Sequence, residues 1–145
     1  WTPIYSGVTN QNGTLTMPIV VNENTRARMV SDGTWERLAG QSSEVQLQTP
    51  RRIVFTSAPT SNKHGLEFSI SGKILPAPLS SENLKLSLTD ATNPAAKSDV
   101  QVDSEGNFTA SMTENRIGIH MYQFSLPASD RYLATASDFV TVVIR

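Results

Sequence analysis

Two histidines, His64 and His120, are the side chains of this sequence best suited to move a proton near neutral pH. The polar, turn-like neighbours of His64 predict a solvated loop residue. His120 alternates with Tyr122 and Phe124, which predicts a hydrogen-bonded and partly buried residue of a strand. A serine, His120 and Asp130 could make up a hydrolytic triad, but no Gly-x-Ser-x-Gly sequence supports one. We therefore predict that the chain is not an enzyme and has no catalytic residue.

Oxygen-bearing residues that could bind calcium occur at two turns, residues 10–13 and 103–106. A calcium loop alternates oxygen ligands before an obligatory glycine and is completed by an acidic residue further along. Both turns contain the glycine and neither is followed by that acidic residue, so hairpin turns are expected. An interdomain calcium site using Asp99, Asp103 or Glu105 is the alternative. The sequence has no cysteine, which excludes disulfides and thiolate sites, and we predict no metal and no other cofactor.

Aromatic side chains could form a platform on which sugar rings stack, and the candidates are Trp1, Tyr5, Trp35, Tyr122 and Tyr132. Their spacing is irregular. Trp35 and Tyr132 occupy roughly equivalent positions of an internal repeat, which favours a shared role in packing over a duplicated ligand site. These two residues are nevertheless the candidates for a surface that binds carbohydrate or protein.

Charged side chains are few and balanced, with 12 Lys and Arg against 13 Asp and Glu in 145 residues. Residues 1–50 carry 3 basic and 4 acidic groups, and residues 51–145 carry 9 of each. No field that would attract nucleic acid is expected. Many neutral polar residues and no apolar run of transmembrane length suit a secreted β-protein, so we predict an extracellular or cell-surface location without membrane insertion.

Apolar residues alternate with polar ones along much of the chain, which predicts an all-β fold. Clusters of Gly, Pro, Asn, Asp and Ser separate these segments about every ten residues. In the second part of the chain we predict seven strands, near 51–56, 65–75, 84–89, 98–103, 107–112, 118–126 and 138–144. Gly72, inside the second of them, predicts a bulge or a close backbone approach. Seven strands are what an immunoglobulin-type β-sandwich requires.

The sequence repeats part of itself. Residues 8–16 match 101–109, and residues 43–47 match 137–142, at a spacing of about 93 to 95 positions, the length of one immunoglobulin-sized sandwich. The first copy contains counterparts of the later strands only, near 14–21, 25–30 and 43–48, with a further strand at 1–5 as an option. We therefore predict a complete sandwich over 51–145, preceded over 1–50 by the C-terminal half of a second, similar β-domain.

A half-domain of three or four strands cannot cover its own apolar face. Upstream residues, the neighbouring domain or strands donated by another chain could cover it. The boundary at residues 49–52 is short, which predicts limited freedom between the two units, and the pair Arg51 and Arg52 is expected to be solvated there. Because Trp1 is not a natural start, we expect the chain to be a piece of a longer protein.

Five segments together resemble, in order and spacing, the bacterial immunoglobulin-like repeats of secreted and cell-surface proteins: 68–74, 103–108, 118–122, 127–133 and 137–143. The resemblance covers about 51–145, and residues 8–49 match the second half of such a repeat. It implies an immunoglobulin-like antiparallel β-sandwich in a tandem array and transfers no catalytic residue.

The leading hypothesis from the sequence is a non-catalytic extracellular structural or spacer module of a multidomain protein. The alternatives are an adhesin-type domain that binds carbohydrate or protein, and an accessory domain of a secreted enzyme. The expected partners are neighbouring domains of the same array and strands of a partner chain over residues 1–50.

Overall fold

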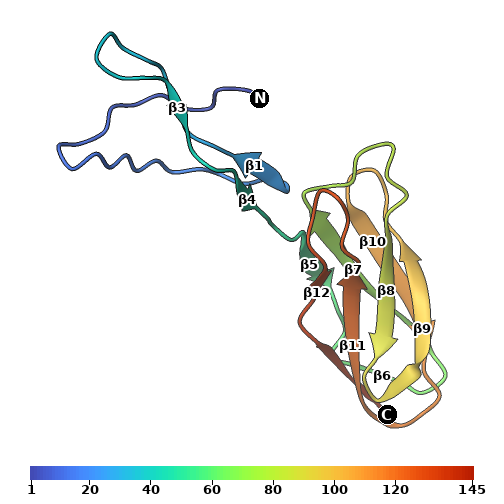
Figure 1. The fold of residues 1–145 in the computed structure, drawn as a ribbon. Helices are drawn as coiled ribbons and strands as arrows, with labels where there is room; N and C mark the ends of the chain where they lie inside the picture. Colours follow the sequence, from blue (N-terminus) through green and yellow to red (C-terminus); the bar gives the residue numbers. More distant parts are fainter.

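A computed structural model describes all residues from 1 to 145. In it, residues 51–145, where apolar and polar residues alternate, form two layers of strands (Figure 1). The smaller layer has the order β10 (Asn107–Thr113), β7 (Glu67–Leu75), β5 (Arg52–Ser57). The larger layer has the order β6 (Ser61–Asn62), β13 (Val140–Ile144), β11 (Gly118–Leu126), β8 (Lys85–Asp90), β9 (Asn93–Gln101), and β12 (Thr135–Ala136) also pairs with β11.

All neighbouring strands in these two layers are antiparallel except β6 and β13, which are parallel. The prediction of an all-β fold is confirmed, because every regular element of the chain is a strand. None of the elements is therefore a helix that could cross a membrane.

Alternate residues from the two layers meet in one hydrophobic core, as in a β-sandwich. Its fully buried side chains are Phe124, Ile70, Ile74, Leu86, Ile144 and Val142. The rings of Phe108 and Phe124 lie 5.2 Å apart, and Phe55 packs edge-on against Phe124 at 5.5 Å. Each such side chain contributes roughly 2 to 3 kcal/mol when it is removed from water, so this core supplies the main stabilisation of residues 51–145.

Gly72 lets Phe108 lie directly against the β7 backbone. A Cβ atom at Gly72 would come within 2.5 Å of Phe108 Cζ and 2.6 Å of the Val54 carbonyl oxygen, closer than real Cβ contacts. On the opposite strand, the register of β5 shifts between Phe55 and Ser57. Of the two alternatives predicted for Gly72, the close backbone approach is confirmed, and the bulge lies on the partner strand β5.

Six of the seven strands predicted for residues 51–145 lie within about two residues of their expected bounds, and one of them, β11, matches them fully. β9 differs, because it begins at Asn93 rather than near residue 98. It is an edge strand of its layer, and only Val100 of its nine residues is buried. An exposed edge strand needs no apolar alternation, so the usual signal of a strand is missing there.

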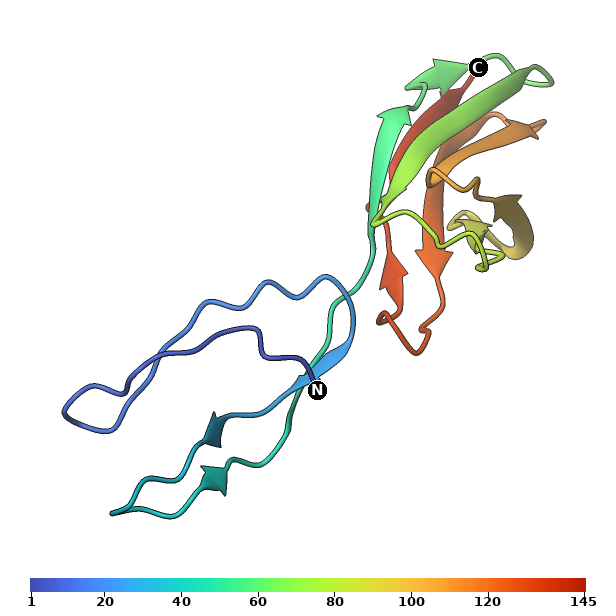
Figure 2. The same ribbon diagram turned by 90° about the horizontal axis from the view of Figure 1, so that it is seen from above.

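Residues 1–50 form a separate unit of short strands without a core (Figure 2). β1 (Thr25–Ala27) pairs with β4 (Val45–Leu47), and β2 (Val30–Ser31) pairs with β3 (Gly40–Gln41). Residues 14–21 and 1–5 are not strands, so those two expectations are wrong as stated. No residue of this unit is buried, whereas 22 residues of the second are.

Candidate functional site

The two candidate binding residues lie in different environments. Trp35 is at the tip of the hairpin that joins β2 and β3, with 92% of its surface exposed, whereas Tyr132 is buried in the loop between β11 and β12. The shared packing role expected for them is therefore wrong for Trp35. The structure does not bring the two residues together into one surface.

The hairpin registers explain why these residues are not equivalent. Ala27 pairs with Val45 in the first unit, and Tyr122 pairs with Val140 in the second. Each residue of the first hairpin thus lies 95 positions before its counterpart. At that spacing Trp35 corresponds to Asp130 and not to Tyr132.

Tyr132 instead forms part of the junction between the two units. The guanidinium group of Arg51 lies 4.2 Å from the centre of the Tyr132 ring, a cation–π contact. Arg51 is only 3% exposed, so its predicted solvation is wrong, whereas Arg52 is exposed as expected. The signal that could have revealed this is alternation, because Arg51 precedes Ile53 and Phe55 on the side of β5 that packs against the core.

The positive charge of Arg51 is neutralised by Glu82, which comes from the loop between β7 and β8. Arg51 Nη2 donates to Glu82 Oε2 at 2.5 Å, and the same oxygen accepts a hydrogen bond from the Leu79 amide at 2.9 Å. Partial burial of Glu82 opposes its ionisation, but these hydrogen bonds and the charge of Arg51 hold its pKa below the ordinary value. The pair therefore carries both charges at neutral pH and ties the linker to this loop.

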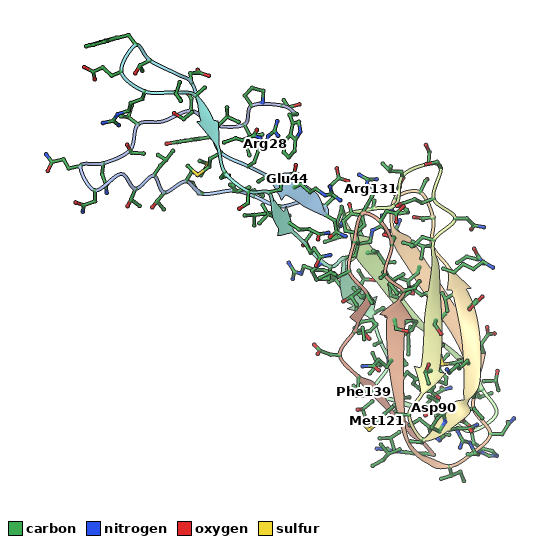
Figure 3. All side chains as sticks on the ribbon, viewed as in Figure 1. Arg28, Glu44, Asp90, Met121, Arg131 and Phe139 are labelled. Carbon is green, nitrogen blue, oxygen red and sulfur yellow. The ribbon has the colours of Figure 1, made fainter.

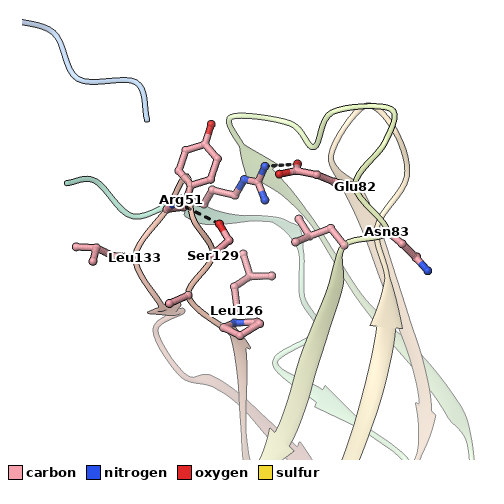
Figure 4. A pocket seen from close by; sticks show the side chains of 10 residues that line it. Arg51, Glu82, Asn83, Leu126, Ser129 and Leu133 are labelled. Atoms are coloured by element: carbon pink, nitrogen blue, oxygen red, sulfur yellow. Dashed lines mark hydrogen bonds and ion pairs between the residues drawn. The ribbon is translucent and has the colours of Figure 1, made fainter. Parts of the chain in front are cut away.

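A cavity of about 220 Å³ lies beside this pair (Figure 4). Its lining includes Arg51, Glu82, Leu84, Leu126, Ser129 and Tyr132. The Arg51 side chain reaches across it from the Tyr132 ring to Glu82, and the Nε atom of Arg51 has no hydrogen-bond partner. The cavity lining contains no histidine or cysteine, and the hydroxyl of its serine, Ser129, accepts a hydrogen bond from the Tyr132 amide at 3.2 Å.

Asn24 joins the two units through three hydrogen bonds. Its backbone N–H donates to the Arg131 carbonyl oxygen at 2.7 Å, and its Nδ2 donates to the Asp130 carbonyl oxygen at 3.2 Å. Its Oδ1 accepts from the Thr49 amide at 3.1 Å. The Leu133 amide in turn donates to the Thr49 carbonyl oxygen at 3.0 Å. One side chain of the first unit thus holds both the linker and a loop of the second unit.

An ion pair between Glu23 and Arg131 reinforces this contact. Figure 3 shows Arg131 at the end of the sandwich that faces the first unit. Both side chains are partly exposed, so water screens their attraction and the pair adds little stability. The hydrogen bond that Arg131 donates to Glu23 raises the pKa of Arg131, which keeps its charge. The Glu23–Arg131 pair therefore acts chiefly by fixing the orientation of the two units. The junction as a whole is polar, as contacts between domains commonly are.

A second charged cluster lies at the opposite end of the sandwich, where Figure 3 labels Asp90. Asp90, Glu114 and His120 place ligand-type atoms within 4.8 Å of one another. Arg116 already occupies the position that a cation would take, because its Nη2 lies 2.8 Å from Asp90 Oδ2 and 3.0 Å from Glu114 Oε2. These distances make the group an internal ion-pair network, in which the Arg116 guanidinium balances the charge of the two carboxylates without a metal ion.

The prediction for His120 is confirmed in kind, since the side chain is hydrogen-bonded, and it is more deeply buried than expected. His64 is exposed in a turn, also as predicted. His120 lies near the start of β11, and Asp130 lies in the loop that follows this strand. The hydrogen bonds of His120 go to other residues, so the two side chains do not form part of a hydrolytic triad. The two turns proposed as alternative calcium loops are hairpin turns, closed by hydrogen bonds to Asn10 and Asp103.

No protein-family model and no curated protein matches this chain.

Proposed function

We propose that this chain is a non-catalytic structural module of an extracellular or cell-surface protein, in which an immunoglobulin-like sandwich follows the C-terminal half of a similar domain. The strand order supports this proposal. Among the seven long strands, the first, second and fifth share one layer, and the third, fourth, sixth and seventh share the other. This division resembles that of an immunoglobulin constant-type sandwich, except that the fourth strand, β9, lies in the layer of the third, sixth and seventh.

The observation that carries the proposal is the hydrogen bonding of Asn24 to both sides of the junction. A spacer must hold its neighbours at a set distance and angle, and a freely jointed linker could not do so. Here the linker is short, and its flanks are fixed by Asn24, by the Glu23–Arg131 pair and by Arg51. The module thus acts by geometry, keeping a functional domain away from the surface to which the array is anchored.

Distance measurement between two spin labels tests this proposal directly, because the chain has no cysteine of its own. Labels at Gln46→Cys and Gln101→Cys, both exposed strand positions, report on the two units. We expect a narrow distance distribution in the parent and a broad one in the Asn24→Ala, Arg131→Ala double variant. Asn22→Ala, at an exposed asparagine, is the control. A broad distribution in the parent would contradict the proposal.

Trp35 favours a second candidate function, that of an adhesin-type domain. Its indole is 92% exposed, and Leu38 on the same hairpin tip is 96% exposed. Exposed aromatic and apolar groups at a loop tip can stack on a sugar or dock a protein. Binding on a glycan array that is lost in Trp35→Ala and kept in the buried-site variant Tyr132→Phe would support it, and an array without any binding would exclude glycans. An accessory domain of a secreted enzyme would be this same module beside a catalytic domain.

A further inference from the structure

The two units share a turn down to its individual hydrogen bonds. Asn10 Oδ1 accepts from the amides of residues 12 and 14, and Asp103 Oδ1 accepts from the amides of residues 105 and 107. Both turns are closed by the same two backbone bonds, and their glycines, Gly13 and Gly106, have φ angles of 75° and 86°. The internal repeat is therefore a repeat of structure, at a spacing of 93 positions here.

The hairpin that follows is shared in the same way. In the first unit the register slips by one residue between the pairs Ala27–Val45 and Val30–Gln41. In the second unit it slips by one residue between the pairs Tyr122–Val140 and Ser125–Ala136. Residues 14–31 and 40–47 thus correspond to the end of a sandwich, from β10 to β13.

The counterparts of β10 and β11 in the first unit lack the strands that cover them in the second. Every residue of β10 pairs with β7, and β11 pairs with β8 over Tyr122–Ser125. By contrast, the backbone groups of residues 15–22 make no hydrogen bond at all. An extended segment with free N–H and C=O groups is a template for another strand.

The apolar side chains of this segment alternate as those of β10 do. Phe108, Ala110 and Met112 face the core from β10, and Leu15, Met17 and Ile19 stand at the corresponding positions 93 residues earlier. Ile19 is 39% exposed, and Met29 and Val45 on the adjoining hairpin are 45% and 56% exposed. The neighbouring sandwich does not provide the cover, since its hydrogen bonds to this unit go to residues 23, 24 and 49.

We propose that residues 14–20 are an acceptor site for one antiparallel β-strand with the chemistry of β7, supplied by the front half of a like domain. This rests on the proposed function, because it takes the first unit to be half of a repeat. The strand would place apolar side chains, as Phe68 and Ile70 do, on the apolar face of the acceptor. Residues 14–22 carry no charge, so no charged group opposes its approach. Pro18 limits the acceptor to an edge position, which β10 also has in its layer.

A synthetic peptide with the sequence of residues 66–75 is the probe, added to the full chain, and amide hydrogen exchange is the measurement. We expect exchange at alternate residues of 14–20, those whose N–H groups face the added strand, to slow by about tenfold or more on saturation. Met17→Lys, on the apolar face, should abolish this effect. Thr16→Lys, on the opposite exposed face, is the matched control and should retain it. Circular dichroism checks that both variants keep the sandwich.

Unchanged exchange at saturating peptide would overturn the proposal. So would protection of the same amides without peptide, accompanied by dimers in light scattering that Met17→Lys dissolves, because the occupant would then be a second copy of this chain. Neither result bears on the spin-label distances, since the junction is held by residues outside 14–20. Failure of this proposal is therefore distinguishable from failure of the structural role.

Discussion

His120 and Asp90 are joined across the end of the sandwich, with His120 Nδ1 lying 3.1 Å from Asp90 Oδ2. The other ring nitrogen, Nε2, lies 2.9 Å from the carbonyl oxygen of Arg116, which can only accept a hydrogen bond. Both nitrogens of this buried ring therefore lie beside hydrogen-bond acceptors. Arg116 joins the same cluster, because its Nη2 atom lies 2.8 Å from Asp90 Oδ2 and 3.0 Å from Glu114 Oε2.

Acid should weaken the sandwich through this cluster. Burial opposes the ionisation of Asp90, but hydrogen bonds from Thr92, His120 and Arg116 hold its pKa below the ordinary value, and Arg116 lowers the pKa of Glu114. A carboxylate with a lowered pKa stabilises the fold above its unfolded pKa, which is 3.8 for Asp and 4.5 for Glu. That stability is lost as the pH falls through the folded value.

We therefore expect the contribution of Asp90 and Glu114 to the free energy of unfolding, measured in urea, to stay constant from pH 7 to 5. Below pH 4.5 this contribution should fall. Asp90→Asn should reduce the stability at pH 7 and flatten this fall. Asp138→Asn, at an exposed aspartate, is the control. An equally steep fall in Asp90→Asn would contradict the assignment to this cluster.

Removal of His120 should destabilise the sandwich strongly. His120→Ala leaves Asp90 buried with one partner fewer and opens a space under Tyr122, whose ring stacks on the imidazole at 6.2 Å. We expect a loss of about 3 kcal/mol in urea unfolding, because a large buried side chain and a hydrogen-bond partner of Asp90 are both removed. His64→Ala, at the exposed histidine, should change the stability by less than about 0.5 kcal/mol. Similar values for the two variants would contradict this.

High pH should also destabilise the sandwich, through Tyr122. Burial of its phenol, with the nearby charges of Asp90 and Glu114, raises its pKa from 10.0 to about 12. Between these values the unfolded chain loses the proton and the folded chain keeps it, so the free energy of unfolding falls as the pH rises. Absorbance at alkaline pH should show one tyrosine ionising near pH 12, and Tyr122→Phe should remove that step. Its persistence in Tyr122→Phe would assign the step to another tyrosine.

The sequence predicts strands well where apolar alternation and a partner strand occur together. β7, β10 and β11 satisfy both conditions and lie where the alternation places them. Residues 14–21 show the same alternation and form no strand, because the hydrogen bonds of a strand need a neighbour that this unit does not contain. The alternation of apolar residues thus identifies the face of the strand that must be covered, but it does not show which segment covers that face.

The polar sites were harder to predict, because each depends on residues far apart in the sequence. Glu82 lies 31 positions from Arg51, and Asp90 lies 30 positions from His120. No local spacing indicates either pair. Motif similarity equates Trp35 with Tyr132, whereas the two hairpin registers, which lie 95 positions apart, align Trp35 with Asp130. Only the burial of Arg51 could have been predicted from the sequence, because this residue continues the alternation of Ile53 and Phe55 on the core-facing side of β5.

Arg51 should therefore matter to stability far more than its neighbour Arg52. Arg51→Ala removes the cation–π contact with Tyr132 and leaves the Glu82 carboxylate, which now retains only the Leu79 amide, beside a larger cavity. We expect a loss of about 2 to 4 kcal/mol in urea unfolding, because one partner of a buried ion pair is left without the other. Arg52→Ala, at the exposed arginine one residue later, should cost less than about 0.5 kcal/mol.

Adding Glu82→Gln to Arg51→Ala should restore part of the loss, since the uncompensated charge is then gone. A double variant less stable than Arg51→Ala would show that Glu82 is held by groups other than Arg51.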